Sequence, residues 1–494
     1  MELNILLIHA DQHRFDCLGA YGNPDVRTPN IDAVAADGVR YTESFCPLPI
    51  CTPSRYSLLT GLYVRQHLGG TNRCTLPAGL ETFPRLLREA GYSTAAVGKM
   101  HFTPTYLDVG FDEMRLAEQD GEGRYDDDYH RWLREEGLCD RLDLMDQVRE
   151  YRDAAPPEYW RAFGAIESDL DEAHHSTTWI GDRAVEAVDR WAGGGNLLMV
   201  GFIKPHHPFD PPAPWSGMYD ADALTVLPGW LDEPMPRDLA FSRGYFPHAD
   251  LTEQALRRAM AHYYATISQI DHHVGRLIDV LKRRGLYDRT IIVYTGDHGD
   301  YLGFHHMLLK GNYLYDPLAK VPLIVKLPAG RRAGEVSGEL VSNVDVAPTL
   351  LSLCGCDVPA AMQGIDLSAE GAAAGRDAVF AEDWGGRQYM ARTRDRKLLL
   401  CPDDRQSQYF DLAADPLEMT NLYADPARRS EIDELRSRLL RWALFDRPYV
   451  AHVDEAAGTI DADNAPPPDD ARVRDAADYY RRKMNEPLCP RFDT

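Results

Sequence analysis

Long hydrophobic runs and an excess of positive charge are both missing from this sequence of 494 residues. The N-terminal stretch MELNILLIHADQHR has no basic leader-like segment and no cleavage-like site. Its apolar run is also far shorter than a membrane span. These absences argue against a membrane anchor, and we expect a cytoplasmic protein unless a leader has been removed.

The charge balance is strongly acidic. Asp and Glu number 77 against 53 Lys and Arg, which gives a formal net charge of −24. Such a surface repels nucleic acid and anionic membranes, so we expect neither as a partner. A small anionic substrate is still compatible with the sequence, because a local basic cleft can override the mean field of the surface.

Cysteine is scarce and scattered, with nine residues, an odd number. This is not the dense set typical of a disulfide framework. Cys51 stands out, because PICTPSRYSLLTG places it on a turn directly ahead of an apolar helix and close to Arg55. A buried cysteine usually packs as a small hydrophobe, whereas one at a helix start beside an arginine has a lowered pKa and can react. Both interpretations are open at this point.

The length and the hydrophobic pattern predict a large α/β domain. Apolar residues make up 44% of the chain, enough for a sizeable core. Helical patterns at 80–90, 176–191 and 252–284 alternate with five short apolar runs: LNILLIHADQH, STAAVGKMH, NLLMVGFIKPHH, TIIVYTGDHGD and VPLIVKL. Alternation of this kind predicts a doubly wound α/β fold over residues 1–375, with helices on both faces of a mixed or parallel sheet.

Beyond residue 375 the pattern changes to short strands joined by polar turns, followed by one helix from about residue 427 to 444. Residues 376–450 are therefore predicted to form a small α+β domain. The tail over 451–494 contains DADNAPPPDDAR and is predicted to be largely irregular. Residues 112–175 are acidic and are predicted to form an insertion near the cleft.

Polar residues follow four of the predicted strands at the point where each strand ends. Asp11 with Gln12 and Asp297 with His298 supply two carboxylates, an amide oxygen and an imidazole, which together could hold one divalent cation. Taken alone, either aspartate is better explained by a role in a turn. Ligands in doubly wound folds bind at the carboxyl ends of the strands, and four such clusters together indicate one site.

Five basic groups add to these polar clusters. They are Lys99, His101, His206 and Lys310, with Arg55 as a fifth. Each lysine alone is usually a solvated side chain, and each histidine a structural one. On an acidic chain, however, cations gathered at a metal site indicate binding of a tetrahedral oxyanion.

At this point the chain resembles a known family, the sulfatases of the alkaline phosphatase superfamily. CTPSR at Cys51–Arg55 is similar to the sulfatase signature Cys-x-Pro-Ser-Arg. Six other stretches resemble family blocks in the same order: NILLIHADQ, RTPNIDAVAADGVRYTESF, GYSTAAVGKMH, KPHHPFDPP, TGDHGDYLG and YFDLAADPLEMTNL. The resemblance reaches to about residue 425 and implies an alkaline-phosphatase-like fold with a small C-terminal domain.

The resemblance also implies a mechanism. In this family the signature cysteine is oxidised to formylglycine by a formylglycine-generating enzyme, so Cys51 would not be a thiol in the active protein. One hydroxyl of the hydrated aldehyde attacks sulfur and expels the alcohol. The second hydroxyl then collapses to the aldehyde and expels sulfate.

Residue roles follow from the resemblance position by position. Asp11, Gln12, Asp297 and His298 correspond to metal ligands, together with modified Cys51. Arg55 would orient the hydrated aldehyde, and Lys99 and Lys310 would bind the sulfate oxygens. His101 would deprotonate the second hydroxyl, and His206 would donate to the leaving oxygen. Asn72, in GGTNR, is a further candidate for substrate contact.

The chain departs from the usual family pattern at three positions. Gln12 replaces the second aspartate, His298 replaces a common asparagine, and Leu62 replaces an arginine of the signature. Choline sulfatases and phosphonate monoester hydrolases resemble the chain at the first two. Calcium is the first expectation for the metal, but the nitrogen ligand and the lost charge bring in manganese and zinc as alternatives.

The sequence therefore predicts a sulfuric ester hydrolase acting on a small-molecule or saccharide sulfate ester. A phosphonate monoester or phosphodiester hydrolase on the same scaffold is the alternative. The stretch GKMH favours sulfate, because the resemblance implies a lysine and a histidine at these positions in sulfatases. A third interpretation is a non-catalytic binding protein with unmodified Cys51. The organic part of the substrate and a homo-oligomeric state are left open.

Overall fold

An eight-stranded sheet forms the centre of the molecule, seen in a computed structural model that describes residues 2–119, 127–241, 246, 248–369, 371–445 and 470–485. Its strands are β1 (Asn4–Asp11), β2 (Val39–Phe45), β3 (Ser93–Gly98), β4 (Glu113–Leu116), β5 (Asn196–Pro205), β6 (Thr290–Gly296), β7 (Leu323–Lys326) and β8 (Glu335–Ser342). They are ordered β4-β3-β5-β1-β6-β7-β2-β8. β1, which carries Asp11, thus lies in the interior of the sheet.

All five predicted apolar runs are strands of this sheet, namely β1, β3, β5, β6 and β7. β7 differs in direction, since it pairs antiparallel with both β6 and β2, whereas the other pairs are parallel. The sheet is therefore mixed. All four β7 residues are buried, because the strand is covered on both faces. Burial of this kind produces an apolar run whichever way the strand points, so the run could not reveal the direction.

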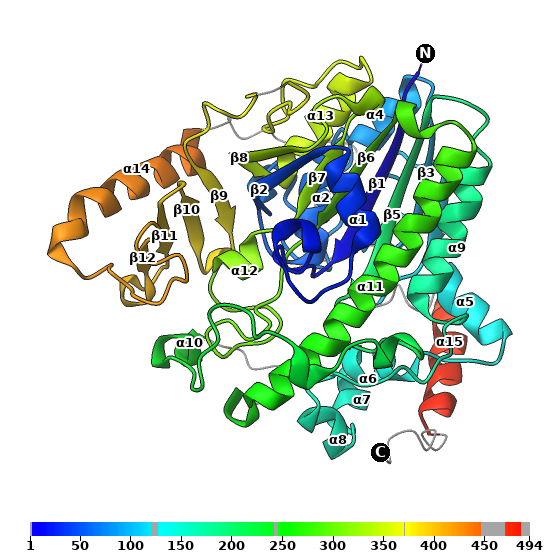
Figure 1. Ribbon diagram of the computed structural model, residues 1–494, viewed down its shortest axis with the longest axis horizontal. Helices are drawn as coiled ribbons and strands as arrows, with labels where there is room; N and C mark the ends of the chain where they lie inside the picture. Colours follow the sequence, from blue (N-terminus) through cyan, green and yellow to red (C-terminus); the bar gives the residue numbers. More distant parts are fainter. Residues whose placement is uncertain are drawn as a thin grey trace.

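Helices cover both faces of the sheet (Figure 1). They are α1 (Pro29–Ala36), α9 (Ser176–Asp189) and α11 (Glu253–Arg283) on one face, and α2 (Cys51–Thr60), α4 (Phe83–Glu89) and α13 (Val346–Leu353) on the other. Because side chains alternate along a strand, Leu6 and Ile8 of β1 pack on the first layer and Ile5 and Leu7 on the second. The predicted doubly wound α/β fold is confirmed.

Shorter helices lie in the segments that connect these elements. The predicted insertion contains α5 (Asp128–Glu135), α6 (Arg141–Gln147), α7 (Arg149–Asp153) and α8 (Pro157–Arg161), and elsewhere lie α3 (Val64–His67), α10 (Pro236–Phe241) and α12 (Asp316–Ala319). In the described ranges, no helix combines the length and the apolar character needed to cross a membrane.

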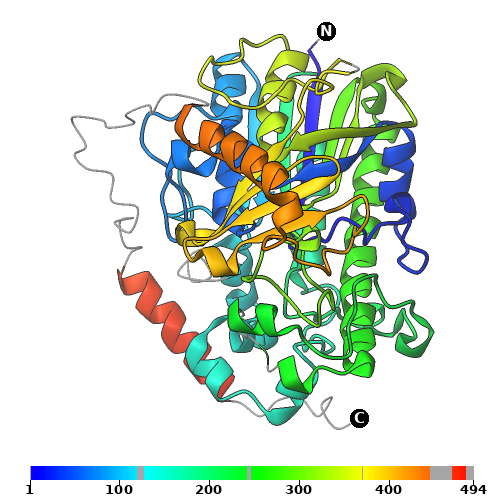
Figure 2. The ribbon, with the colours of Figure 1, turned by 90° about the vertical axis from the view of Figure 1, so that its left-hand side faces the viewer.

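The C-terminal part forms a second, antiparallel sheet. It contains β9 (Val379–Glu382), β10 (Tyr389–Arg392), β11 (Arg396–Leu400) and β12 (Gln408–Asp411), ordered β12-β11-β10-β9, with α14 (Arg429–Phe445). Figure 2 shows α14 lying across this sheet, where Leu435 and Trp442 pack against Leu398. The opposite face packs on the segment 301–319 that carries Lys310. A small α+β unit is thus present, and its boundary at 375/376 stays a prediction.

The tail is less irregular than expected. Within the predicted irregular range 451–494, α15 (Asp470–Met484) is a helix, while 451–469 and 486–494 lie outside the described residues. Ala476 and Tyr480 of α15 are buried against Cys139 and Leu144 of the insertion. The hydroxyl of Tyr479 donates to the carbonyl of Leu138 at 2.6 Å. Tertiary packing on the insertion therefore stabilises a helix that the polar composition of the tail concealed.

Candidate active site

The predicted site residues gather at the carboxyl edge of the large sheet. Asp11 ends β1, Asp297 follows β6, and Lys99 and His206 follow β3 and β5. These four strands are neighbours in the sheet. One edge of the sheet thus brings these side chains together, while their roles stay predictions.

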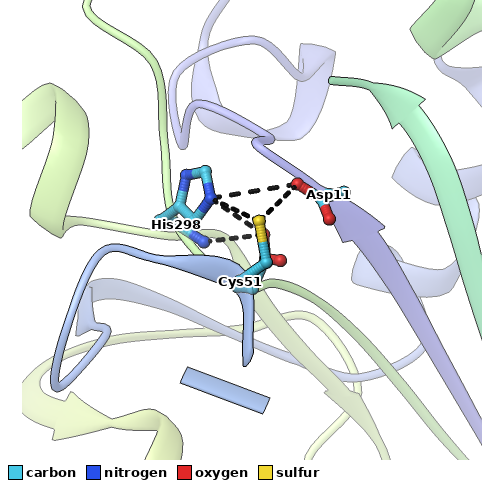
Figure 3. Close-up of side chains that lie close together, drawn as sticks. Asp11, Cys51 and His298 are labelled. Atoms are coloured by element: carbon cyan, nitrogen blue, oxygen red, sulfur yellow. Dashed lines mark hydrogen bonds and ion pairs between the residues drawn. The ribbon is translucent and has the colours of Figure 1, made fainter. Parts of the chain in front are cut away.

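Four potential ligands surround one point. Asp11, Cys51, Asp297 and His298 are all buried, and one ligand atom from each lies within 4.8 Å of the others. The Sγ of Cys51 lies 3.5 Å from Asp11 Oδ1 and 3.4 Å from His298 Nε2 (Figure 3). The same nitrogen lies 3.8 Å from Asp11 Oδ1 and 3.9 Å from Asp297 Oδ1. Ligands of one cation sit about 2.0–2.6 Å from it, so this spacing fits a shared ion.

Gln12 follows Asp11 directly in the chain and offers an amide oxygen as a further potential ligand. Its Oε1 is buried and has no hydrogen-bond partner within the described residues. Its backbone N–H donates to Asp297 Oδ1 at 2.9 Å, at a φ of 61°. An unpaired buried oxygen is costly, and a cation would satisfy it. Two carboxylates, an imidazole nitrogen and this oxygen therefore fit a divalent metal ion.

Arg55 lies beneath the two carboxylates. Its side chain is fully buried and donates to Asp11 Oδ2 at 3.0 Å and to Asp297 Oδ2 at 3.1 Å. Burial raises the pKa of Asp11, but Lys99 and Arg55 outweigh burial and hold that pKa well below its usual range. Both carboxylates are thus charged near neutral pH. The predicted orientation of a hydrated aldehyde by Arg55 stays a prediction, since its contacts here are to the carboxylates and to the Lys99 carbonyl.

Cys51 is the first residue of α2. The following residue is fixed on two sides, because Thr52 N–H donates to Asn72 Oδ1 at 3.1 Å and Thr52 Oγ1 donates to the His101 carbonyl at 2.8 Å. Burial and Asp11 raise the pKa of the Cys51 thiol, but Lys310 and Lys99 outweigh them and lower it to about 5. The position is built to stabilise negative charge, which indicates a reacting group rather than a packing one.

Two ammonium groups contact the residues of this site. Lys310 Nζ lies 3.3 Å from Cys51 Sγ and 3.1 Å from His298 Nε2. Lys99 Nζ contacts Asp11 Oδ2 at 2.8 Å. Positive charge from both lysines acts on the reacting position, which suits a tetrahedral oxyanion, as the sequence predicts.

Of the two predicted catalytic histidines, His206 and His101, the contacts define the tautomer of His206. His206 Nδ1 donates to the His207 carbonyl at 2.7 Å, so Nε2 is the acceptor for Lys310 Nζ at 3.1 Å. Burial and Lys310 lower the pKa of His206 well below its usual value, so this imidazole is neutral. The donation from His206 to the leaving oxygen stays a prediction. The roles of His101 as a base and of Asn72 as a substrate contact stay predictions.

Comparison with known proteins agrees with this geometry. The model of the sulfatase family matches residues 3–356, and that of the C-terminal region of N-sulphoglucosamine sulphohydrolase matches residues 304–443. The chain belongs to the sulfatase family. As a sulfatase of the alkaline phosphatase superfamily, it is a sulfuric ester hydrolase, as the sequence predicts.

The sulfatase is similar to several characterised proteins. It is 31% identical to an arylsulfatase of Clostridium perfringens, over 89% of this chain and 94% of the relative. It is 28% identical to an N-acetylglucosamine-6-O-sulfatase of Bacteroides thetaiotaomicron, over 88% and 85%. The crystal structure of the phosphonate monoester hydrolase of Agrobacterium radiobacter matches with a TM-score of 0.75 at 25% identity, over 90% and 96%.

Three polar residues of the sulfatase site were not singled out from the sequence. Gln119 Oε1 accepts from Lys99 Nζ at 3.0 Å, and Glu118 Oε1 accepts the His101 N–H at 2.9 Å. Burial raises the pKa of Glu118 to about 7. Asp300 contacts Gln12. For Gln119 and Glu118, the available signal in the sequence was the acidic insertion predicted near the cleft. For Asp300 it was the GDHGD stretch.

Proposed function

We propose that this sulfatase hydrolyses saccharide sulfate esters with a formylglycine formed from Cys51 and a divalent cation. A formylglycine-generating enzyme would then be its maturation partner. The observation that carries the proposal is the position of Cys51 Sγ, which lies within 3.5 Å of Asp11, His298 and Lys310. A cysteine that only packs behaves as a small hydrophobe and is usually surrounded by apolar side chains, not by charged groups.

Asp11, Gln12, Asp297 and His298 would hold the cation together with modified Cys51. Calcium is our first proposal, because three of the four unmodified residues offer oxygen. Manganese and zinc are the alternatives, because His298 offers nitrogen. When bound, the cation supplies positive charge that favours deprotonation of a neighbouring hydroxyl.

The remaining residues would act on the sulfate group. Lys99 and Lys310 would bind its oxygens by charge-assisted hydrogen bonds and so stabilise the negative charge of the transferring group. Lys310 contacts His206 Nε2, so this pair would deliver the proton to the departing alcohol. His101 would accept the proton of the second formylglycine hydroxyl as that hydroxyl collapses to the aldehyde and sulfate leaves, and Arg55 would keep the carboxylates in place.

A saccharide as the organic part is supported by the similarity to an N-acetylglucosamine-6-O-sulfatase. The alternative is a phosphonate monoester, supported by the similarity to a phosphonate monoester hydrolase. Fully modified enzyme should be assayed on a panel of saccharide sulfates, aryl sulfates and phosphonate monoesters. Highest kcat/KM on saccharide sulfates is the expected result, and a phosphonate turned over better than every sulfate would favour the alternative.

Replacing Lys99 with alanine should lower kcat/KM for sulfate esters by about 10²–10³-fold. Loss of one charge-assisted contact to the transferring group costs about 2.7–4 kcal/mol of transition-state stabilisation. Steady-state kinetics on the best sulfate ester would measure the effect.

The matched control for Lys99 is Lys326→Ala. Lys326 is also buried, but it ends the antiparallel strand β7 and donates to the Thr290 carbonyl at the start of β6, at the opposite edge of the sheet. The control should stay within about threefold of wild type. A Lys99 variant equally close to wild type would place Lys99 outside the reacting site.

A further inference from the structure

The amide of Gln12 has two chemically different ends. A half-turn exchanges Oε1 with the NH₂ group while hardly changing the shape of the side chain. Only the oxygen can bind a cation, because the NH₂ group presents hydrogens. Gln12 can therefore serve the metal site only if a neighbour determines which end faces the carboxylates.

Asp300 makes that selection. Its Oδ2 accepts from Gln12 Nε2 at 2.6 Å. Its Oδ1 accepts the backbone N–H groups of Leu302 at 2.7 Å and Leu309 at 2.9 Å. A carboxylate only accepts hydrogen bonds, so it selects the NH₂ end of the amide. Asp300 is fully buried, and rotating its carboxylate would break two backbone hydrogen bonds.

The rest of Gln12 is held just as firmly. Its carbonyl accepts from the Tyr263 hydroxyl at 2.6 Å, and its N–H donates to Asp297 Oδ1. The one polar atom of Gln12 left without a hydrogen bond, within the described part of the chain, is Oε1. Because hydrogen bonds hold the other polar atoms of Gln12, its Oε1 is held in place and is free to accept a ligand.

We propose that Asp300 is a positioning residue that presents Gln12 Oε1 to the cation, so that Gln12 and Asp300 act as one unit. The proposal rests on the metal site described under Proposed function. It also explains why an amide stands where the family commonly has an aspartate. A carboxylate at position 12 would face the buried carboxylate of Asp300, and two such charges repel each other.

The test is the affinity for Mn²⁺, and separately for Ca²⁺, measured by calorimetry on Asp300→Asn. The N–H groups of Leu302 and Leu309 would retain the oxygen of the new amide, so its NH₂ group would face Gln12 and turn that side chain around. Replacing such an outer-shell partner typically weakens metal affinity 10–100-fold, and we expect a loss in that range. Unchanged affinity would overturn the proposal.

Asp271→Asn is the matched control. Asp271 is also buried, and it likewise accepts two backbone N–H groups, from Asn30 and Ile31, and one side-chain amide, from Asn30. It lies on α11, and these hydrogen-bond partners lie on α1. Its replacement should leave metal affinity within about twofold of wild type. An equal loss in both variants would show a general effect of buried amides and would overturn the role of Asp300.

Gln12→Glu tests the pair with Asp300 intact, in case Asp300→Asn folds poorly. The added charge alone would tighten cation binding, but repulsion from Asp300 predicts that Gln12→Glu binds Mn²⁺ no tighter than wild type. Adding Asp300→Asn should restore tight binding, since the new amide can donate to the glutamate. Tighter binding by Gln12→Glu alone would contradict the pairing. A wild-type protein that bound neither ion would overturn the metal site itself, and the role of Asp300 with it.

Discussion

Replacing Asp297 with alanine should remove the bound divalent cation and lower kcat/KM by about 10³-fold or more. A metal ion contributes several kcal/mol to stabilisation of the transition state, and 4 kcal/mol corresponds to roughly that factor. Asp297 is central because its Oδ1 accepts the N–H groups of Gln12 and His298, and its Oδ2 accepts from Arg55. Elemental analysis of purified protein and steady-state kinetics would measure both effects.

Asp297→Asn separates loss of metal from loss of fold. Alanine leaves the buried Arg55 short of one partner, which by itself destabilises the protein. Asparagine keeps an oxygen for the two backbone N–H groups but removes the charge. We therefore expect Asp297→Asn to melt closer to wild type while still losing most of its metal. Wild-type metal content and turnover in the alanine variant would show that the metal assignment is wrong.

The sequence predicted the centre of the site because the centre depends on strand ends. Asp11, Lys99, His206 and Asp297 each follow an apolar run that is recognisable on its own, and a parallel arrangement brings such ends together. The central strands could be located for the same reason. β2 and β8, which were not predicted, mix buried residues with partly exposed ones and lack a continuous apolar run.

The contacts that complete the site could not be predicted in this way. Gln119 contacts Lys99 from the insertion, and Asp300 contacts Gln12 across 288 positions of the chain. Neither pair has a characteristic spacing, because the fold and not the local chain sets the distance. α15 is a similar case, since its helix depends on burial of Ala476 and Tyr480 against residues far away in the sequence. The local composition of the chain does not predict such packing.

The C-terminal unit has a role in the site that composition did not reveal. One face of its sheet packs on Tyr301, Tyr313 and Tyr315, which flank Lys310 in the chain. The Tyr301 hydroxyl also donates to the Tyr313 carbonyl at 2.7 Å, closing the loop between them. The small domain thus supports the loop that brings Lys310 to Cys51.

The state of Cys51 should control activity more strongly than any other single feature. Cys51→Ala should lose about 10⁴-fold or more in kcat, the scale seen when a covalent nucleophile is removed. The wild-type thiol should be similarly inert, because one sulfur cannot both attack the substrate and provide a second hydroxyl to expel sulfate. A thiolate is also a poor partner for a hard cation held mainly by oxygen.

Mass spectrometry of the peptide spanning Cys51 would measure the modified fraction, since the aldehyde form lacks sulfur and reacts with hydrazide reagents. Protein expressed with and without a modifying enzyme provides a matched pair of identical sequence. Both preparations should fold alike, because the change is confined to one side chain at the start of α2. Specific activity should rise in proportion to the aldehyde fraction. Full activity from protein whose Cys51 is entirely alkylatable thiol would exclude formylglycine as the nucleophile, and the low pKa of the thiol would then indicate direct attack by Cys51 itself.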